Sequence, residues 1–400
     1  MTSKRLKDKK VPNLRFPGFD GEWEQKKLGE IADKITDGTH DTPKPIEVGV
    51  PFLTAIHIKN GFIDYENCYY LEQEVHNHIY KRCNPEKGDL LIVNIGAGTG
   101  NCALNTVNYE FSLKNVALVK VSKNIIDGCF LFQVQIKNSS KIFTKLAAGG
   151  AQPFLSLKEI GRLKIVFPSL VEQQKIASFL ALIDERIATQ NKIIEQLETL
   201  IKGLCQNLAN NKQWEKQYLR NILTERKETN KDNLPIFSVS VSKGVINQIE
   251  YLGRSFASKN ITNYNVVHFG DVVYTKSPTG EFPYGIIKQS FISENVAVSP
   301  LYGVYEPKNV CIGNILHYYF NSPINANNYL HSLVQKGAKN TINITNQRFL
   351  DNTIFLPTDE KEVENIASLL NNIDQKIQTE KAILTQFENQ KKYLLNQMFV

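Results

Sequence analysis

The sequence lacks the signatures of several common classes of protein. Its six cysteines form no Cys-x-x-Cys pair, and no histidine stands at metal-ligand spacing from them, which argues against a zinc site or a disulfide framework. No apolar run approaches the roughly 20 residues of a membrane span, and the charged N-terminus has no apolar segment behind it. We therefore expect a cytoplasmic protein whose cysteines are buried free thiols.

Motifs for nucleotide-driven or methyl-transfer chemistry are also missing. No glycine is followed by lysine, which excludes a Walker A phosphate loop. An adenine methyltransferase should carry an Asp/Asn-Pro-Pro-aromatic motif, and the nearest match, Asn321-Ser322-Pro323, lacks the second proline and the aromatic residue. The glycine cluster 94–100 imitates a cofactor-binding turn, but any tight loop that needs positive φ selects glycine. We therefore expect no catalytic residue and no cofactor in this chain.

Positive charge is concentrated in two parts of the chain. The length of 400 residues favours two or more domains. The formal net charge is +7, and residues 169–210 and 357–400 together carry −3, so the remaining chain carries +10. A basic balance confined to two regions suits a polyanionic partner such as nucleic acid.

An internal repeat with a period of about 190 residues organises the chain. Four pairs of segments carry it: Trp23 with Leu28 and Trp214 with Leu219; Gly88-Asp89-Leu90-Leu91 and Gly270-Asp271-Val272-Val273; Asn115-Val116-Ala117 and Asn295-Val296-Ala297; Ile176-Ala177-Ser178 and Ile366-Ala367-Ser368. The chain is therefore a duplicated unit. Each copy is a mixed domain of about 145 residues followed by a helix of about 40.

The mixed domains show short strand signals at 90–93, 116–119, 272–274 and 296–298. Residues 129–136 and 312–320 fit either a helix or a buried strand. We therefore predict α+β domains. The expected division is a basic N-terminal tail (1–22), a first domain (23–168), a first helix (169–210), a second domain (211–356) and a second helix (357–400).

The two helices carry the clearest pattern. Ser169 with Glu172 resembles a capping box, and Asp359 with Glu362 offers an equivalent start. Apolar residues then recur at alternating steps of three and four over 176–208 and 366–398, and each series is interrupted by a polar residue at the same place, Gln190 or Glu380. Matched heptad seams in one chain predict that the two helices pair with each other.

A second apolar stripe lies beside each seam. It consists of Phe179, Ile193, Leu200, Leu369 and Ile383, and it widens the apolar face beyond what a two-helix seam needs. These side chains either pack on the chain's own domains or bind an outside helical partner.

The chain resembles the specificity subunit of type I restriction-modification systems over essentially its full length. The resemblance rests on the duplication and on three motifs: Pro12-Asn13-Leu14-Arg15-Phe16-Pro17-Gly18-Phe19 before Glu22-Trp23; Asp37-Gly38-Thr39-His40 with Pro43; and Pro168 with Glu172-Gln173 and Ile176 at the start of a long helix. The second copy departs from the pattern, because Glu362-Val363 stands where Glu-Gln is expected and Asp37-Gly38-Thr39-His40 has no counterpart. Such divergence is natural if the two domains read different sequences.

The resemblance implies a subunit without chemistry of its own. In this family each domain is a target recognition domain for one half of a bipartite site in double-stranded DNA, and the two helices form an antiparallel coiled coil that acts as a spacer. Two modification subunits, which carry the S-adenosylmethionine-dependent adenine methyltransferase, dock on the specificity subunit, and restriction (translocase/endonuclease) subunits can join them. A helix of about 40 residues is roughly 60 Å long, enough to hold two modules on successive duplex turns about 34 Å apart. The alternatives are a coiled-coil scaffold that binds no DNA and a stand-alone DNA methyltransferase.

Candidate DNA-contacting residues follow from chemistry, since base edges need polar side chains and phosphates need Lys, Arg or backbone amides, usually on loops. The first domain offers Thr36, Asp37, Thr39, His40, Asn94, Thr99, Asn101 and Gln152. The second offers Lys276, Ser277, Thr279, Lys336, Lys339, Asn340 and Thr341. His40 alternatively caps a turn, and Lys336 and Lys339 are alternatively solvated surface charges.

Overall fold

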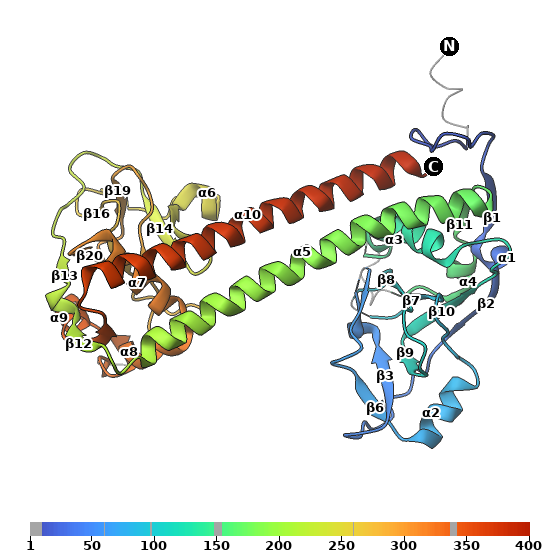
Figure 1. Cartoon of the computed structure of the whole chain (residues 1–400), viewed down its shortest axis with the longest axis horizontal. Coiled ribbons are helices and arrows are strands. Elements are labelled where there is room, and N and C mark those ends of the chain that lie inside the picture. The colour runs from blue at the N-terminus through green and yellow to red at the C-terminus, as the bar shows by residue number, and fades with distance from the viewer. Residues whose placement is uncertain (1–9, 60, 97, 148–153, 259, 337–341) are drawn as a thin grey trace, which may run out of the picture. The chain divides into compact units, whose positions relative to one another are not determined.

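The chain divides into two compact units, each of which includes part of two long helices. The computed structural model describes residues 10–59, 61–96, 98–147, 154–258, 260–336 and 342–400. Residues 1–190 with 383–400 make the first unit, and residues 191–382 make the second. Each unit holds one mixed domain and a part of both α5 (Leu170–Asn210) and α10 (Glu360–Met398) (Figure 1). The predicted fold class, two mixed α+β domains joined by two long helices, is confirmed.

The first unit is built on a four-stranded antiparallel sheet of order β2-β10-β7-β8. Its strands are β2 (Ala32–Asp37), β7 (Leu90–Val93), β8 (Cys102–Leu104) and β10 (Val116–Val121), and α3 (Gly128–Ala147) packs on one face. Successive side chains of a strand point to opposite faces. Leu90 and Ile92 accordingly join the core cluster of α3 and the long helices, whereas Leu91 and Val93 join a cluster on the other face. Burial on both faces explains why this strand is wholly apolar.

Smaller elements complete the first unit. They are β1 (Glu24–Lys27), paired with β11 (Lys164–Phe167); a three-stranded sheet of β6 (Tyr69–Leu71), β3 (Val50–Thr54) and β9 (Ser112–Lys114); the pair β4 (Ile58–Lys59) and β5 (Phe62–Ile63); the 3-10 turn η2 (Ala55–His57); and the helices α1 (Leu28–Ile31), α2 (Gln73–Tyr80) and α4 (Leu157–Gly161).

The second unit repeats the central sheet in the order β13-β20-β17-β18. Its strands are β13 (Leu223–Glu225), β17 (Val272–Tyr274), β18 (Ile287–Gln289) and β20 (Gly303–Pro307), with α7 (Val310–Asn321) packed on β18. The remaining elements are the pairs β12 (Glu215–Tyr218) with β23 (Thr353–Leu356), β14 (Phe237–Ser240) with β15 (Gly244–Asn247), β16 (Asn265–Val267) with β19 (Val296–Val298) and β21 (Gln335–Lys336) with β22 (Ile342–Asn343); the 3-10 turn η3 (Leu219–Asn221); and the helices α6 (Gln248–Leu252), α8 (Pro323–His331) and α9 (Asn346–Leu350).

The strand orders show which segments of the two copies correspond. The match of Gly88 to Gly270 is confirmed, because each glycine has positive φ, 94° and 89°, just before an equivalent strand. The match of residues 115–117 to 295–297 is wrong. Residues 296–298 form β19, which pairs with β16, whereas the counterpart of β10 by pairing is β20. Short apolar triplets recur too easily to fix correspondence without the strand pairing.

The segments 129–136 and 312–320, left open between helix and strand, are helical and belong to α3 and α7. Gly128 and Gly313 show how closely these helices approach the sheet. A Cβ added at either position would lie 2.5 Å from the Gly88 carbonyl oxygen or 3.0 Å from that of Gly270. The two helices therefore occupy equivalent places, and both need glycine at the contact.

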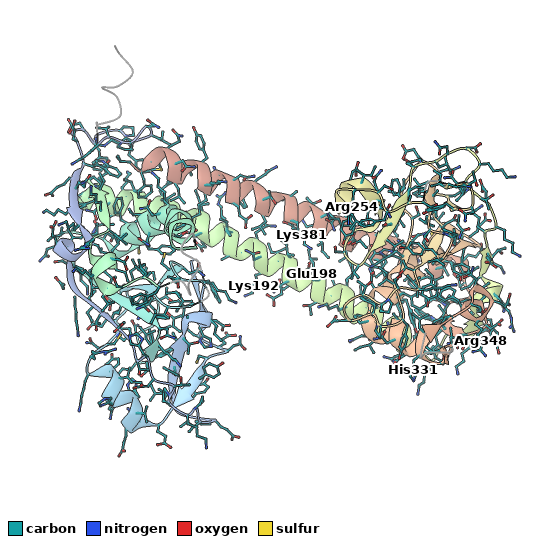
Figure 2. The ribbon with its side chains drawn as sticks, turned by 180° about the vertical axis from the view of Figure 1, so that it is seen from behind. Lys192, Glu198, Arg254, His331, Arg348 and Lys381 are labelled. Carbon is teal, nitrogen blue, oxygen red and sulfur yellow. The ribbon has the colours of Figure 1, made fainter. Side chains whose placement is uncertain are left out.

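The long helices run antiparallel within each unit. In the first unit the seam residues Ile176 and Leu180 share a core cluster with Leu394 and Met398. In the second, Glu198 of α5 accepts a hydrogen bond from Lys381 of α10 at 2.7 Å, and both side chains lie on the helix pair in Figure 2. The polar residues that interrupt the seams, Gln190 and Glu380, are buried, and the Glu380 carboxylate pairs with Lys376. The seams are therefore internal to the helix pair.

The N-terminal segment 10–23 packs on both helices in the first unit. Arg15 donates from Nε and Nη2 to the two carboxylate oxygens of Glu172, both at 2.7 Å. The amide of Leu14 donates to the carbonyl of Gln397 at 2.9 Å, and Phe16 meets Phe179 edge to face. The expected capping role of Glu172 is therefore wrong: its carboxylate holds Arg15. At α10 the Asp359 carboxylate does cap, accepting from the amide of Glu362 at 2.8 Å.

Candidate DNA-recognition sites

The start of the loop after β2 is packed against residues 113–116. Gly38 is required there, because an added Cβ would lie 1.8 Å from the carbonyl oxygen of Leu113. Asp37 accepts hydrogen bonds from Arg82 Nη2 at 2.9 Å and contacts His40 Nε2 at 3.0 Å. The Asp37 side chain is only 12% exposed, whereas His40 and Arg82 are about half exposed. The motif therefore presents His40 and Arg82 to solvent and keeps the carboxylate behind them.

Asn115 connects this loop to the glycine-rich loop after β7. Its side-chain oxygen contacts His40 Nδ1 at 3.2 Å, its amide donates to the carbonyl of Thr39, and its carbonyl accepts from the amide of Asn94, both at 3.3 Å. Asn115 has φ of 57°, the left-handed region that asparagine tolerates better than most residues. The amide of Leu155 in turn donates to the carbonyl of Asn94 at 2.8 Å. Four segments distant in sequence therefore meet at one place.

The glycine-rich loop owes its composition to backbone geometry. Gly96, Gly98 and Gly100 all have positive φ. Thr99 is buried, and its hydroxyl donates to the carbonyl of Gly96 at 2.6 Å. Asn94 is also buried, and its side-chain oxygen has no hydrogen-bond partner within the part of the chain that the structure describes. Of the described residues of this loop, Gly96, Gly98 and Asn101 are half-buried, whereas Asn94, Thr99 and Gly100 are buried.

The first-domain candidates separate into three groups by exposure. His40 is exposed and Thr39 half-buried, whereas Thr36, Asp37, Asn94 and Thr99 are buried. Gln152 lies outside the described residues. Arg82, which the sequence did not single out, stands at this site because the chain returns after α2 to the end of β2. No local motif marks Arg82, so only its pairing with Asp37 reveals it.

The second domain places a loop at the equivalent sheet position. Lys276 follows β17 as Asn94 follows β7 in the register of the two sheets. Gly285 in this loop has φ of 97°, and an added Cβ would lie 1.9 Å from the carbonyl of Thr275. Ser277 and Thr279 are exposed, and burial lowers the pKa of the half-buried Lys276. The candidate loops of the two copies therefore correspond.

Side chains of α8 contact the same loop, and Arg348 of α9 contacts the segment that follows α8. The hydroxyl of Tyr284 lies 2.8 Å from His331 Nδ1, and Arg348 donates to the carbonyl of Leu333. His331 and Arg348 are both labelled in Figure 2. Lys336 lies in β21, and Lys339, Asn340 and Thr341 lie outside the described residues. His331 and Tyr284 were not expected from sequence, because they carry no motif and meet only in the fold.

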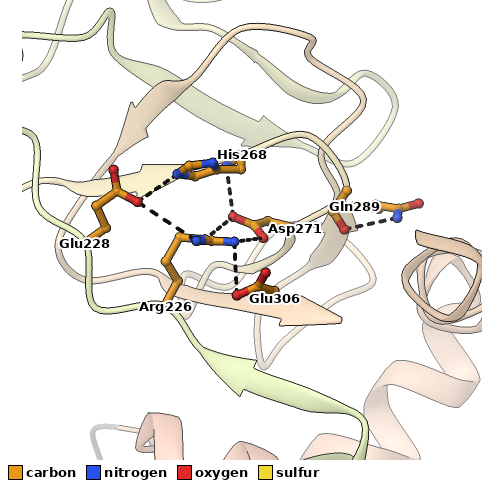
Figure 3. Close-up of polar contacts among 7 residues, drawn as sticks. Arg226, Glu228, His268, Asp271, Gln289 and Glu306 are labelled. Atoms are coloured by element: carbon orange, nitrogen blue, oxygen red, sulfur yellow. Dashed lines mark hydrogen bonds and ion pairs between the residues drawn. The ribbon is translucent and has the colours of Figure 1, made fainter. Parts of the chain in front are cut away.

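A network around Arg226 fixes the turn before β17 (Figure 3). Arg226 donates to both oxygens of Asp271, at 2.7 and 3.0 Å, and lies 3.4 Å from Glu306 and 3.9 Å from Glu228. The amide of His268 donates to Asp271 at 2.8 Å, and the imidazole contacts Glu228 at 2.7 Å. The guanidinium hydrogen bond to Asp271 raises the pKa of Arg226, which stays charged. Three carboxylates surround this arginine, so its role is structural.

The flanking stripe on the helices is unevenly covered. Phe179 packs on the core of the first unit beneath Phe16. Ile193 and Ile383 are half-buried, whereas Leu200 and Leu369 are 49% and 48% exposed. The stripe therefore combines side chains covered by the chain itself with side chains open to solvent.

Within the described ranges, no three or more His, Cys, Asp or Glu side chains are grouped to hold a metal ion. The helices in that same part of the chain include none with the length and apolar character to cross a membrane.

Residues 20–199 match the family described as the type I restriction modification DNA specificity domain. Two similar proteins come from Methanocaldococcus jannaschii. The putative type I restriction enzyme MjaX specificity subunit is 29% identical over 47% of this chain and 45% of its own length, and the MjaVIII specificity subunit is 25% identical over 50% and 44%. The match thus spans about half the length of these relatives.

Solved structures share the fold over nearly the whole chain. The crystal structure of a type I restriction-modification S subunit from M. genitalium covers 98% of this chain and 99% of its own, with a TM-score of 0.62 at 13% identity. A structure from a study of complex assembly and conformational transition in the type I restriction-modification system covers 97% and 99%, with a TM-score of 0.51 at 15% identity. Residues 20–199 are therefore similar to type I restriction modification DNA specificity domains, and nearly the whole chain shares the fold of solved S subunits.

Proposed function

We propose that this chain is the DNA-sequence specificity subunit of a type I restriction-modification enzyme and performs no chemistry itself. The observation that carries the proposal is the duplicated sheet, which offers a polar loop after β7 in one copy and after β17 in the other, in a chain whose first half matches the specificity domain. Each domain, 23–168 and 211–356, reads one half of a bipartite site in double-stranded DNA.

The proposed partners are two modification subunits, which bring S-adenosylmethionine and the methyltransferase, and restriction subunits that join them in the cytoplasm. The exposed Leu200 and Leu369 support a partner surface on the helices, together with Ile193 and Ile383. The lack of methyltransferase and phosphate-loop motifs in the sequence supports a non-catalytic role.

The test is to express the full chain with its modification subunits and to map methylated adenines in genomic DNA. We expect a bipartite motif with a fixed spacer, and no methylation by the isolated chain. Exchange of residues 23–167 for the equivalent domain of a relative should change one half of the motif and leave the other half intact. A scaffold without DNA binding predicts instead that no motif depends on this chain.

The helices α5 and α10 are proposed to set the spacer. Insertion of four residues near Gln190 lengthens the helix by about 6 Å and slightly more than one turn, so the seam partly continues. At about 3.4 Å per base pair, the spacer should grow by one or two base pairs while both half-sites stay the same. An unchanged spacer in a folded, active complex would show that the partner subunits set the distance.

A further inference from the structure

Arg82 is an exposed arginine held by only one of its nitrogens. Its Nη2 donates to Asp37 at 2.9 Å and also to the carbonyl oxygen of Gly38. Nε and Nη1 have no hydrogen-bond partner among the residues that the structure describes. The side chain is 57% exposed. Arg82 therefore has a guanidinium anchored through Nη2, with donors left for another molecule.

Asp37 is less accessible to DNA than Arg82 in this arrangement. One of its oxygens is taken by Arg82 and the other by His40, and the His40 ring is held from its far side by Asn115. Each oxygen of Asp37 already has one partner, and the side chain is only 12% exposed, which limits its access to a base amino group. The Asp37 carboxylate can instead orient the Arg82 guanidinium. Because Arg82 is already oriented before binding, it loses less rotamer entropy when it binds.

Arg82 lies at the candidate DNA-recognition site of the first domain. The chain of hydrogen bonds from His40 through Asn115 to Asn94 joins the arginine's support to the glycine-rich loop. Arg226 in the second unit is a contrast, since its side chain is only 16% exposed and three carboxylates surround it. Of these two Arg–Asp pairs, only the one at Arg82 leaves donors open.

We propose that Arg82 donates to an acceptor of the DNA in the first half-site and that Asp37 is the residue that positions it. The acceptor is either the O6/N7 edge of a guanine or a phosphate oxygen, both of which arginine favours. This inference rests on the proposed function. The test therefore begins with the wild-type complex of the full chain and its modification subunits, whose bipartite motif must first be established.

The experiment compares Arg82→Ala, Arg82→Lys and Asp37→Asn with the wild type by methylation mapping and by duplex binding at several salt concentrations. Arg82→Ala should bind the wild-type site about 5- to 150-fold more weakly, as expected for one lost contact of about 1–3 kcal/mol. Asp37→Asn should show a smaller loss of the same kind. The matched control is Arg220→Ala, because Arg220 is 49% exposed, pairs with Asp351 at 3.0 Å and belongs to the second unit, so its loss should leave the first half-site unchanged.

The two acceptors give different results. If Arg82 reads a guanine, the methylated motif relaxes at one position of the first half-site and Arg82→Lys does not restore it. If Arg82 binds a phosphate, the motif is unchanged, the slope of log affinity against log salt falls by about 1, and Arg82→Lys recovers most of the affinity.

The proposal is overturned if folded Arg82→Ala keeps the affinity, salt slope and motif of the wild type. A purely structural Asp37 is indicated if Asp37→Asn lowers the melting temperature but leaves motif and slope unchanged. If the wild-type complex itself shows no bipartite motif, the proposed function fails instead, so the two failures are distinguishable.

Discussion

Glu172 in α5 and Glu362 in α10 stand at the same position of the two copies and bind different partners. Glu172 is buried and holds Arg15 through both oxygens, whereas the indole nitrogen of Trp23, the residue equivalent to Trp214, is buried without a hydrogen-bond partner in the described part of the chain. Glu362 is exposed and accepts from the indole nitrogen of Trp214 at 2.9 Å. In the first copy, therefore, the glutamate carboxylate binds Arg15 of the N-terminal segment instead of the tryptophan indole.

The same segment explains a difference in exposure. Phe16 covers Phe179 in the first unit. The counterpart of Phe179 in the second copy is Leu369, which is 48% exposed. In the second copy the residues before Trp214 belong to the end of α5, so no corresponding segment is available there. An apolar surface that one copy buries within the chain is left open in the other.

The turn before β7 and β17 has the same geometry in both copies, but the cation that pairs with its aspartate comes from a different residue in each copy. Asp89 and Asp271 each accept from the backbone amide three residues earlier, at 2.8 Å. Lys120 of β10 lies 3.5 Å from Asp89, whereas Glu306 occupies the corresponding position of β20 and Arg226 supplies the cation instead. The carboxylate and its turn are therefore fixed by the backbone, and any nearby residue can neutralise them.

The largest expected difference between the copies is at the two glutamates. Glu172→Ala should destabilise the first unit by about 3 kcal/mol, because the Arg15 guanidinium, 14% exposed, loses its carboxylate and keeps only the carbonyls of Asp20 and Gly21. Glu362→Ala should cost the second unit only about 1 kcal/mol, the net value of one hydrogen bond. The chain has one tryptophan in each unit, so denaturant unfolding of Trp23→Phe and Trp214→Phe backgrounds reports each unit separately. Equal losses would contradict the comparison.

The next position of the helices offers a reciprocal exchange. Gln173 is buried, accepts from the amide of Asp127 and donates to the carbonyls of Ile125 and Pro168, whereas its counterpart Val363 packs in an apolar core. Gln173→Val should cost about 3 kcal/mol, because three backbone groups lose their partner. Val363→Gln should cost about 1–3 kcal/mol through an amide buried without a partner. Thermal unfolding checks both, and a neutral effect of either swap would refute this reading of the divergence.

Acid should destabilise the second unit through His317, whose counterpart in the first copy is Phe132. Burial, aided by the nearby Lys288, lowers the pKa of His317 to about 3 from the ordinary 6.5. The folded state binds fewer protons than the unfolded state between these values, so stability is lost as pH falls below 6.5. At pH 5 the loss should be about 2 kcal/mol at 1.36 kcal/mol per pH unit.

The measurement is the unfolding free energy of the second unit at pH 7 and pH 5, followed through Trp214. His317→Gln keeps an acceptor for the amide of Gln289, which donates to His317 Nδ1 at 3.1 Å, and should remove this part of the pH dependence. The same slope in the variant and the wild type would assign the acid sensitivity to other groups.

The smallest expected difference concerns the interhelical ion pairs. Lys391, 15% exposed, pairs with Asp184 in the first unit, and Lys381, 48% exposed, pairs with Glu198 in the second. Lys391→Met should cost about 1 kcal/mol and Lys381→Met about 0.3 kcal/mol, because an exposed pair is screened by water and salt. Repeating the measurements in high salt should shrink the smaller value further; a salt-insensitive loss at Lys381 would point to packing instead.

Periodic and motif-based features of the fold could be predicted from sequence. Local sequence patterns predict the heptad seams and the two long helices, strands 90–93 and 272–274, and the Gly-Asp turns. These features depend on the spacing of apolar residues and on the backbone preferences of single residues. The correspondence of β10 with β20 could not be predicted, because it depends on which strands pair across long separations. The sequence also pointed to Asp37 and His40 as polar groups of one loop.

Only the tertiary structure decided which of those groups face solvent. Asp37 turns inward because Arg82, returning to β2 after α2, supplies its counter-ion. Glu172 meets Arg15 rather than the start of its own helix for the same reason, since the partner arrives from a distant part of the chain. Local sequence specifies whether a segment is a helix, a strand or a turn. Long-range contacts decide which charged side chains are paired within the protein and which can bind another molecule.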